Sequence, residues 1–227
     1  RGSETDVRAR FSFLGRPVAG VARTTPGVRV RHAQTLREVH PPVLRIEDGG
    51  FEMRGLEAGD YLLDVDVLPD PGADHAPGSY RRVGLPFPVT AASAESRDVP
   101  LAKHLHLLEP FDNLLVVQHG PAWYAEAPVF PSPVRVAWEP LGEAVDYHWS
   151  VVRVEHGPEG ETQEPVLSGS TQESFTHLDL PAIEDDAIYG LRLEAFAGDL
   201  QVGEFWLTAC HDRGIGPVQE LRFRVRR

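Results

Sequence analysis

The stretch GGFEMRGLEAGDYLLDVDV, residues 49–67, determines the fold class of this chain. Gly49 and Gly50 favour a turn, after which apolar and charged residues alternate. A second turn at Gly59 precedes a run in which every second residue is apolar. A side-chain period of two is typical of a strand with one buried face. The stretch therefore predicts two antiparallel strands of a β-sandwich, with a core that includes Phe51, Leu56, Tyr61, Leu63 and Val65.

Composition and charge narrow the class of protein. The chain has 227 residues, of which 41% are hydrophobic, so it can bury one large core or two ordinary ones. The formal net charge of −12 argues against a nucleic acid as the partner, because such binding rests on neutralising phosphates. Cys210 is the only cysteine, which rules out an intramolecular disulfide. No apolar run approaches the roughly 18 residues of a membrane span, so we expect a chain that does not span a membrane.

Further strand-like runs flank the quoted stretch. Residues 7–13 and 28–31 alternate before it, and residues 81–90 and 96–108 follow it. About seven strands result, a number typical of one sandwich domain. Residues 69–78, PDPGADHAPG, suit neither a helix nor a strand ladder, so we expect a surface loop there.

Eight residues of this first half carry a family resemblance: Gly15, Pro17, Gly20, Gly50, Phe51, Leu56, Gly59 and Tyr61. They make residues 5–108 similar to the carboxypeptidase-regulatory-like, transthyretin-like family of sandwich domains. The resemblance implies a non-catalytic module of a bacterial-type extracytoplasmic protein, either periplasmic or at the cell surface.

A second pattern begins after the irregular, proline-rich stretch from Glu109 to Pro133. We place the domain boundary near residue 120, which gives one domain over 5–120 and another over 121–227. The second half resembles fibronectin type III and related immunoglobulin-like domains, with Trp138 as the core tryptophan of the second strand and Tyr189 as the tyrosine-corner residue. The resemblance implies that both are buried, and the whole chain is predicted to be all-β, with two antiparallel sandwiches in tandem. The additional strand-like run 201–210 leaves open which run is the penultimate strand.

Two groups of residues are candidate metal ligands. His104 and His106 form a His-x-His pair, whose rings would share one face of a strand as a zinc site requires. The simpler interpretation is that they form the exposed face of an amphipathic strand, with Leu105 and Leu107 on the opposite face. Neighbouring acids and a third histidine that could complete the site are Glu109, Asp112 and His119.

The second group offers the oxygen ligands that calcium takes: Asp64, Asp66, Asp70 and Asp74. Their spacing is not that of a calcium loop, and the simpler interpretation is a solvated acidic edge that discourages aggregation between strands. We therefore expect the chain to fold without a metal or cofactor.

Aromatic and basic residues are the remaining candidates for binding. Trp123 and Tyr124 could present ring faces to a partner, although packing between the domains is the favoured interpretation. Trp206 lies on the face opposite Phe205 and Leu207, which predicts partial exposure. The arginines of the last run, which we expect on its wet face and which could meet an acidic partner, are Arg222, Arg224 and Arg226.

The sequence contains no nucleophile elbow, no His-Glu-x-x-His and no cysteine–histidine pair with a positioned third group. We therefore expect a non-catalytic interaction or spacer module that binds a protein or polysaccharide through inter-strand loops or a sheet edge. Two alternatives stay open. One is a polysaccharide-binding or enzyme-accessory module that uses exposed aromatics, and the other is a protein that binds a divalent metal weakly.

Overall fold

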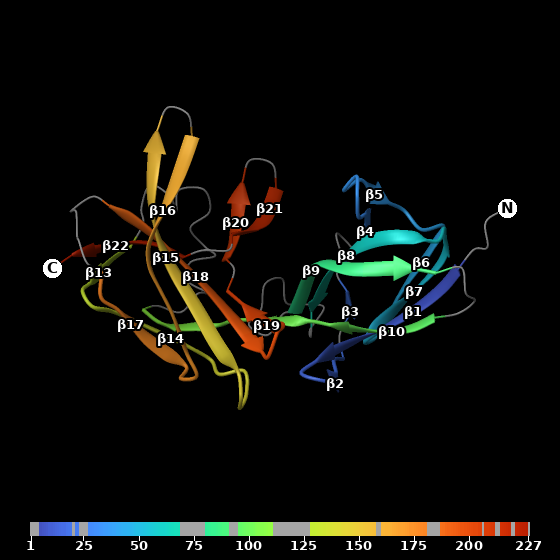
Figure 1. Cartoon of the computed structure of the whole chain (residues 1–227), viewed down its shortest axis with the longest axis horizontal. Helices are drawn as coiled ribbons and strands as arrows, with labels where there is room; N and C mark the ends of the chain where they lie inside the picture. Colours follow the sequence, from blue (N-terminus) through green and yellow to red (C-terminus); the bar gives the residue numbers. More distant parts are fainter. Residues whose placement is uncertain are drawn as a thin grey trace. The chain divides into compact units, whose positions relative to one another are not determined.

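The computed structural model is all-β, and the chain forms two compact units, Arg1–Lys103 and His104–Arg227. Every regular element in the described part of the chain is a strand (Figure 1). The structure describes residues 5–19, 21–22, 27–68, 80–90, 95–110, 128–157, 160–180, 187–205, 207–211, 214–218 and 221–226. The boundary expected near residue 120 falls within 111–127, outside the described residues.

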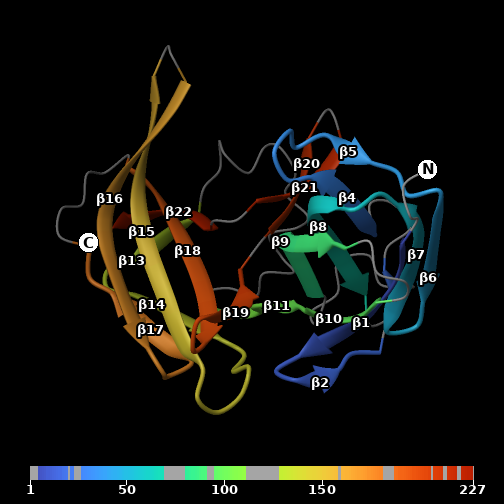
Figure 2. The same ribbon diagram turned by 45° about the vertical axis from the view of Figure 1, so that its right-hand side comes forward.

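Unit 1 is a sandwich of two sheets (Figures 1 and 2). Its strands are β1 (Thr5–Phe13), β2 (Arg16–Pro17), β3 (Val21–Ala22), β4 (Val28–His32), β5 (Glu38–Val39), β6 (Val43–Glu47), β7 (Gly50–Leu56), β8 (Gly59–Leu68), β9 (Tyr80–Val89), β10 (Glu95–Pro100) and β11 (Ala102–His104). The first sheet has the order β10-β1-β7-β6, with β2 paired to β1. The second has the order β9-β8-β4-β5, with β3 paired to β8 and β11 to β9. Among the described pairs of this unit, only β1 and β10 run parallel.

The core of unit 1 lies between these sheets and confirms the register expected from the sequence. Leu63 and Val65 are buried in β8. Every other predicted core residue is also buried: Phe51, Leu56 and Tyr61. The β1 side chains Val7, Ala9 and Phe11 pack into the same cluster.

The glycines of the quoted stretch close a hairpin between β6 and β7. Gly49 has a φ of +74°, which favours glycine, and its carbonyl accepts a 2.8 Å hydrogen bond from the Phe11 amide. Gly50 lies so close to β1 that an added Cβ would be 2.1 Å from the Ala9 carbonyl oxygen. At the start of β8, the Tyr61 hydroxyl donates a 3.0 Å hydrogen bond to the Glu57 carbonyl and fixes the second turn.

Unit 2 is a second sandwich. Its strands are β12 (Leu107–Glu109), β13 (Val129–Pro131), β14 (Val134–Trp138), β15 (Asp146–Gly157), β16 (Gly160–Thr171), β17 (Phe175–Leu178), β18 (Ile188–Ala197), β19 (Leu200–Glu204), β20 (Leu207–His211), β21 (Gly214–Val218) and β22 (Leu221–Arg226). One sheet has the order β12-β14-β17. The other has the order β16-β15-β18, and the free side of β18 pairs with both β19 and β22. β13 pairs in parallel with β22. Residues 107–109, expected to complete the first sandwich, therefore pair within the second, opposite β14.

Trp138 and Tyr189 are both buried in unit 2, as predicted. The Trp138 ring lies 5.2 Å from the ring of Tyr147, measured between centroids. The Tyr147 hydroxyl accepts a 2.8 Å hydrogen bond from the Leu141 amide upstream of it. This bond anchors the chain between β14 and β15 to the core, which is the kind of contact that the sequence assigned to Tyr189.

Two strands of unit 2 pair with one side of β18. Glu204 of β19 lies opposite Glu194 of β18, and the Phe205 amide continues this ladder with a 2.8 Å bond to the Leu193 carbonyl. An uninterrupted strand would next place residue 207 opposite Leu191, but Leu221 of β22 occupies that position. β19 and β22 thus pair with successive parts of the same side of β18, and the β20–β21 hairpin lies between them in the sequence (Figure 1). β18, one of the two runs that the sequence left open as the penultimate strand, pairs with β15 on one side and with β19 and β22 on the other.

Candidate functional site

Several sequence candidates lie outside the described residues. These are the aromatic residues Trp123, Tyr124 and Trp206, the loop aspartates Asp70 and Asp74, and the neighbours of the histidine pair, Asp112 and His119.

The interpretation of His104 and His106 as an exposed strand face is wrong. Both histidines are buried, and so are Leu105 and Leu107. The segment is not one strand, because β11 ends at His104 and β12 begins at Leu107. The His104 ring stacks on the ring of Phe205 at 6.2 Å between centroids. In the described part of the chain, no three histidine, cysteine, aspartate or glutamate side chains are arranged to hold a metal ion.

We expect EDTA to leave the melting temperature of the chain unchanged, because neither candidate group has the spacing of a structural site. A scanning calorimetry trace with and without chelator measures this. A fall of more than about 5 °C, roughly what a loss of 1 kcal/mol causes in a small domain, would contradict it. The variants His104→Ala and Asp66→Asn would then distinguish the two groups.

The interpretation of Asp64 as part of a solvated edge is also wrong. Asp64 is 9% exposed, and β8 lies between β4 and β9 instead of at an edge. Its Oδ1 accepts hydrogen bonds from Arg31 Nη2 at 2.7 Å and from the Gly84 amide at 2.8 Å. Gly84, with a φ of +68°, belongs to a bulge of β9 opposite Asp64. The hydrogen bond to Asp64 raises the pKa of Arg31. The carboxylate therefore closes a β-bulge and neutralises an arginine.

We expect Asp64→Asn to lower the free energy of unfolding of the chain by about 2–3 kcal/mol, because an amide leaves the Arg31 charge without its partner. Urea unfolding at neutral pH measures the change. The control is Asp60→Asn, an exposed position in the same strand, for which we expect a change within about 0.5 kcal/mol. Equal effects of the two substitutions would contradict the bulge-closing role.

The arginines of β22 were expected on its solvent-exposed face, and this expectation fails at one position. Arg222 is only 5% exposed, whereas Arg224 is partly exposed and Arg226 is exposed. Only the end of β22 therefore presents its arginines to solvent, and the row cannot act as one basic surface.

A row of charged side chains crosses the outer face of the first sheet of unit 1. Arg8 of β1 lies opposite Glu52 of β7, which lies opposite Arg45 of β6. Glu52 accepts hydrogen bonds from Arg54 Nη2 at 2.8 Å and from Arg8 Nε at 3.5 Å. The Arg54 hydrogen bond is the main reason why the pKa of Glu52 lies below its ordinary value, against the opposing effect of burial.

Folding lowers the pKa of Glu52 below the value of the unfolded chain, which is about 4.3. The ionised Glu52 therefore contributes its full stabilisation above that pH. The stabilisation is lost as the pH falls through the lower pKa of the folded chain. We expect Glu52→Gln to be less stable than the natural chain at pH 7 and to lose less stability between neutral and acid pH. Urea unfolding of the natural chain and of Glu52→Gln at a series of pH values measures how steeply the free energy of unfolding of each depends on pH. The exposed Glu38→Gln is the control, and a Glu52→Gln slope equal to that of the natural chain would contradict the prediction.

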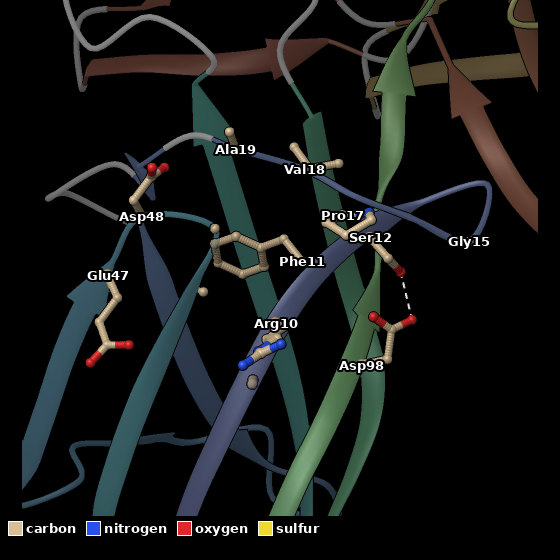
Figure 3. A pocket seen from close by; sticks show the side chains of 13 residues that line it. Arg10, Phe11, Ser12, Gly15, Pro17, Val18, Ala19, Glu47, Asp48 and Asp98 are labelled. Carbon is tan, nitrogen blue, oxygen red and sulfur yellow. Dashed lines mark hydrogen bonds between the residues drawn. The ribbon is translucent and has the colours of Figure 1, made fainter.

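A second row of positions on the same outer face, two residues further along the strands, lies at a pocket (Figure 3). The row consists of Asp98, Arg10, Gly50 and Glu47, on β10, β1, β7 and β6. Gly50 has no side chain, so the row has a gap between Arg10 and Glu47. The β1–β2 hairpin borders the gap with Gly15, Pro17, Val18 and Ala19, and the pocket volume is about 480 Å³. This volume lies within the range of small-ligand sites.

We call this cavity the β1–β2 pocket; the residues of the second row and of the hairpin named above line it. Its lining includes charged groups and a hydroxyl group. The Ser12 hydroxyl is buried and donates a 2.5 Å hydrogen bond to Asp98 Oδ2, which holds the carboxylate at the rim. Figure 3 shows Asp98 and Glu47 on opposite sides of the pocket, with Arg10 between them. The side chains of Arg10 and Glu47 form no hydrogen bond or ion pair with any residue that the structure describes. The β1–β2 pocket thus offers charged groups to a ligand.

Sequence reasoning missed the β1–β2 pocket although its signal was present. Gly15, Pro17 and Gly50 line it, and all three were used as evidence for the fold alone. The partner of Ser12, Asp98, lies 86 residues further along the chain. Only the parallel pairing of β1 with β10 brings the two together.

Exposed aromatics do not form a stacking platform in the described part of the chain. Phe175 is the one large aromatic side chain there that is exposed, at 37%. The Arg135 guanidinium covers its ring at 5.2 Å and pairs with Glu109. A sugar platform of several coplanar rings is therefore not present among these residues.

No protein-family model matches the chain, and no curated protein matches it. The solved structures that are similar to it include two DUF3823 family proteins. A DUF3823 family protein from Parabacteroides merdae is 9% identical, with a TM-score of 0.28, over 99% of this chain and 100% of that one. A DUF3823 family protein from Bacteroides uniformis is 10% identical, with a TM-score of 0.29, over 98% of this chain and 96% of that one. Among the described residues, no helix has the length and apolar character needed to cross a membrane.

Proposed function

We propose that the chain is a non-catalytic interaction module of an extracytoplasmic protein, and that the β1–β2 pocket binds a protein partner. The observation that carries the proposal is the pocket itself, which is a concave site on the outer face of a sheet, bordered by a hairpin and lined by charges. Binding sites on sandwich domains are commonly built from loops held by a rigid frame. The absence of catalytic motifs from the sequence supports a binding role over an enzymatic one.

The arrangement of strands supports the family part of the proposal. In unit 2, β12-β14-β17 form one sheet, and β16-β15-β18 with β19 and β22 form the other. This is the order expected of a fibronectin type III-like sandwich, with the β20–β21 hairpin as an insertion. In unit 1, the Tyr61 hydroxyl bond and the Gly49–Gly50 hairpin agree with a carboxypeptidase-regulatory-like domain. The carboxypeptidase-regulatory-like family serves as non-catalytic modules in extracytoplasmic proteins, and this resemblance supports the extracytoplasmic setting.

The test is retention of a partner from envelope and secreted fractions of the source organism on the immobilised full chain. Ala19→Trp fills the β1–β2 pocket from an exposed position, and Thr35→Trp places the same ring at a distant exposed position. We expect the natural chain and Thr35→Trp to retain the same protein and Ala19→Trp to lose most of it. Equal retention by all three, or no retained protein, would overturn the proposed site. Recovery of the native protein in the cytoplasmic fraction would overturn the proposed location.

A further inference from the structure

The charges of the β1–β2 pocket are unequal. Among the described lining residues, the carboxylates of Glu47 and Asp98 stand against the guanidinium of Arg10. Asp48 also lines the pocket, but it already has an interaction of its own. Glu47 and Asp98 lie on opposite sides, at the two ends of one row of strand positions, so a group between them meets a carboxylate in either direction (Figure 3). Such a site favours a cationic group, and the net charge of −12 adds an attraction of the same sign at longer range.

The hairpin side of the β1–β2 pocket has a different character. Pro17, Val18 and Ala19 give this wall an apolar surface. The side chains of arginine and lysine combine an apolar stem with a charged end, and they lay the stem along apolar surfaces while the charge remains solvated. A basic side chain therefore matches both the apolar wall and the acidic rim.

Arg10 repels any cationic group in the pocket, an arginine or lysine side chain included, but the carboxylates of Glu47 and Asp98 outnumber it, and a peptide, unlike an inorganic cation, also offers acceptors to Arg10. Its guanidinium only donates hydrogen bonds, and a peptide backbone supplies carbonyl acceptors beside each side chain. Since Arg10 has no ion pair with any described residue, its donors are available for such carbonyls. A basic residue within an extended peptide thus matches the acidic rim, the apolar wall and Arg10.

From these observations we propose that the β1–β2 pocket binds an arginine or lysine side chain of an extended partner segment. The charged end lies between Asp98 and Glu47, the stem lies on the exposed Pro17 and Ala19, and Arg10 donates to a carbonyl of the segment. This proposal rests on the proposed function, because it names the partner chemistry of the same site.

The test is a titration of the ¹⁵N-labelled full chain with the peptide acetyl-Gly-Arg-Gly-amide, followed by amide chemical shifts. The amides of Gly15, Gly49 and Gly50 line the pocket and are the reporters. Two matched probes carry citrulline or glutamate in place of arginine. Citrulline preserves the shape of arginine without its charge. We expect saturable shifts of the reporters with the arginine peptide below about 10 mM, weaker ones with citrulline and none with glutamate. Raising the salt concentration should weaken the arginine response.

Variants of the two carboxylates complete the experiment. Glu47→Gln and Asp98→Asn should each weaken binding of the arginine peptide about two- to fivefold, the range of an exposed ion pair, without changing binding of the citrulline peptide. The Glu47 side chain makes no hydrogen bond within the described residues, so Glu47→Gln tests the charge without disturbing the Ser12–Asp98 pair. Glu38→Gln is the charge-matched control and should bind as the natural chain does.

The outcomes separate this proposal from the function on which it rests. Equal responses to arginine and citrulline, or a stronger response to glutamate, would overturn the basic ligand and leave the pocket as a binding site. Reporter shifts from none of the three peptides, together with retention of a partner that Ala19→Trp abolishes, would likewise overturn only the ligand class. If no peptide shifted the reporter amides and Ala19→Trp retained the partner as well as the natural chain does, both the basic ligand and the β1–β2 pocket as the binding site would be overturned.

Discussion

Replacing Trp138 with alanine is expected to lower the free energy of unfolding of unit 2 by about 3–5 kcal/mol, the usual cost of removing a buried tryptophan. Trp138 is fully buried, and its ring contacts that of Tyr147. It also occupies the central strand of its sheet, opposite Leu107 on one side, with β17 on the other. Alanine would leave a cavity that the two rigid sheets can fill only in part. Denaturant unfolding followed by fluorescence and circular dichroism measures the loss.

The matched control is Phe175→Ala in the neighbouring strand of the same sheet. Phe175 is 37% exposed, and its ring lies under the Arg135 guanidinium instead of in the core. Its loss should cost about 1 kcal/mol or less. If Trp138→Ala shifted the unfolding free energy by less than about 1 kcal/mol, Trp138 would not be a core residue of unit 2.

Burial inside a strand is the part of the fold that the sequence predicts well. Phe51, Tyr61 and Trp138 stand in regions of clear alternation, and each is buried as the alternation indicates. A period of two records which face of a strand meets the core, and this information is local. It needs no knowledge of which strands are neighbours.

Neighbour relationships are where the sequence-based predictions were wrong. Asp64 does point away from the core, but whether it is solvated depends on the position of β8 in the sheet. With β4 on one side and β9 on the other, Arg31 and the Gly84 bulge cover the carboxylate. The alternation of β8 is identical in a central and in an edge strand, so the pattern alone cannot tell the two apart.

The histidine pair shows a second limit. The alternation of His104 to Leu107 is regular in the sequence, but the chain leaves the ladder between β11 and β12. The Leu105 amide bonds to the Glu204 carbonyl at 3.0 Å, and the Glu139 amide bonds to the His106 carbonyl at 2.9 Å. These bonds are to partners far along the chain, which hold all four side chains in buried positions. Pattern reasoning assumes one continuous strand and therefore assigned two of them to solvent.

Replacing Gly50 with alanine is expected to lower the free energy of unfolding of unit 1 by about 3 kcal/mol, at the upper end of the cost of overpacking. The new Cβ would stand 2.1 Å from the Ala9 carbonyl oxygen, a backbone atom that cannot rotate away. Relief requires β1 and β7 to separate at the Arg10–Gly50 pair, where both strands belong to the middle of their sheet. Urea unfolding measures the loss of stability.

The control for this prediction is Gly15→Ala, because the two glycines are needed for different reasons. Gly15 has a φ of +72° and no atom within 4 Å of an added Cβ, so alanine there meets only backbone strain, which costs about 1–2 kcal/mol. Gly50 has no positive φ, so alanine there meets only the steric conflict with β1. If Gly50→Ala were no more harmful than Gly15→Ala, β1 and β7 would be able to separate at little cost. The gap between Arg10 and Glu47 would then not require glycine, and the β1–β2 pocket would owe its shape to the hairpin alone.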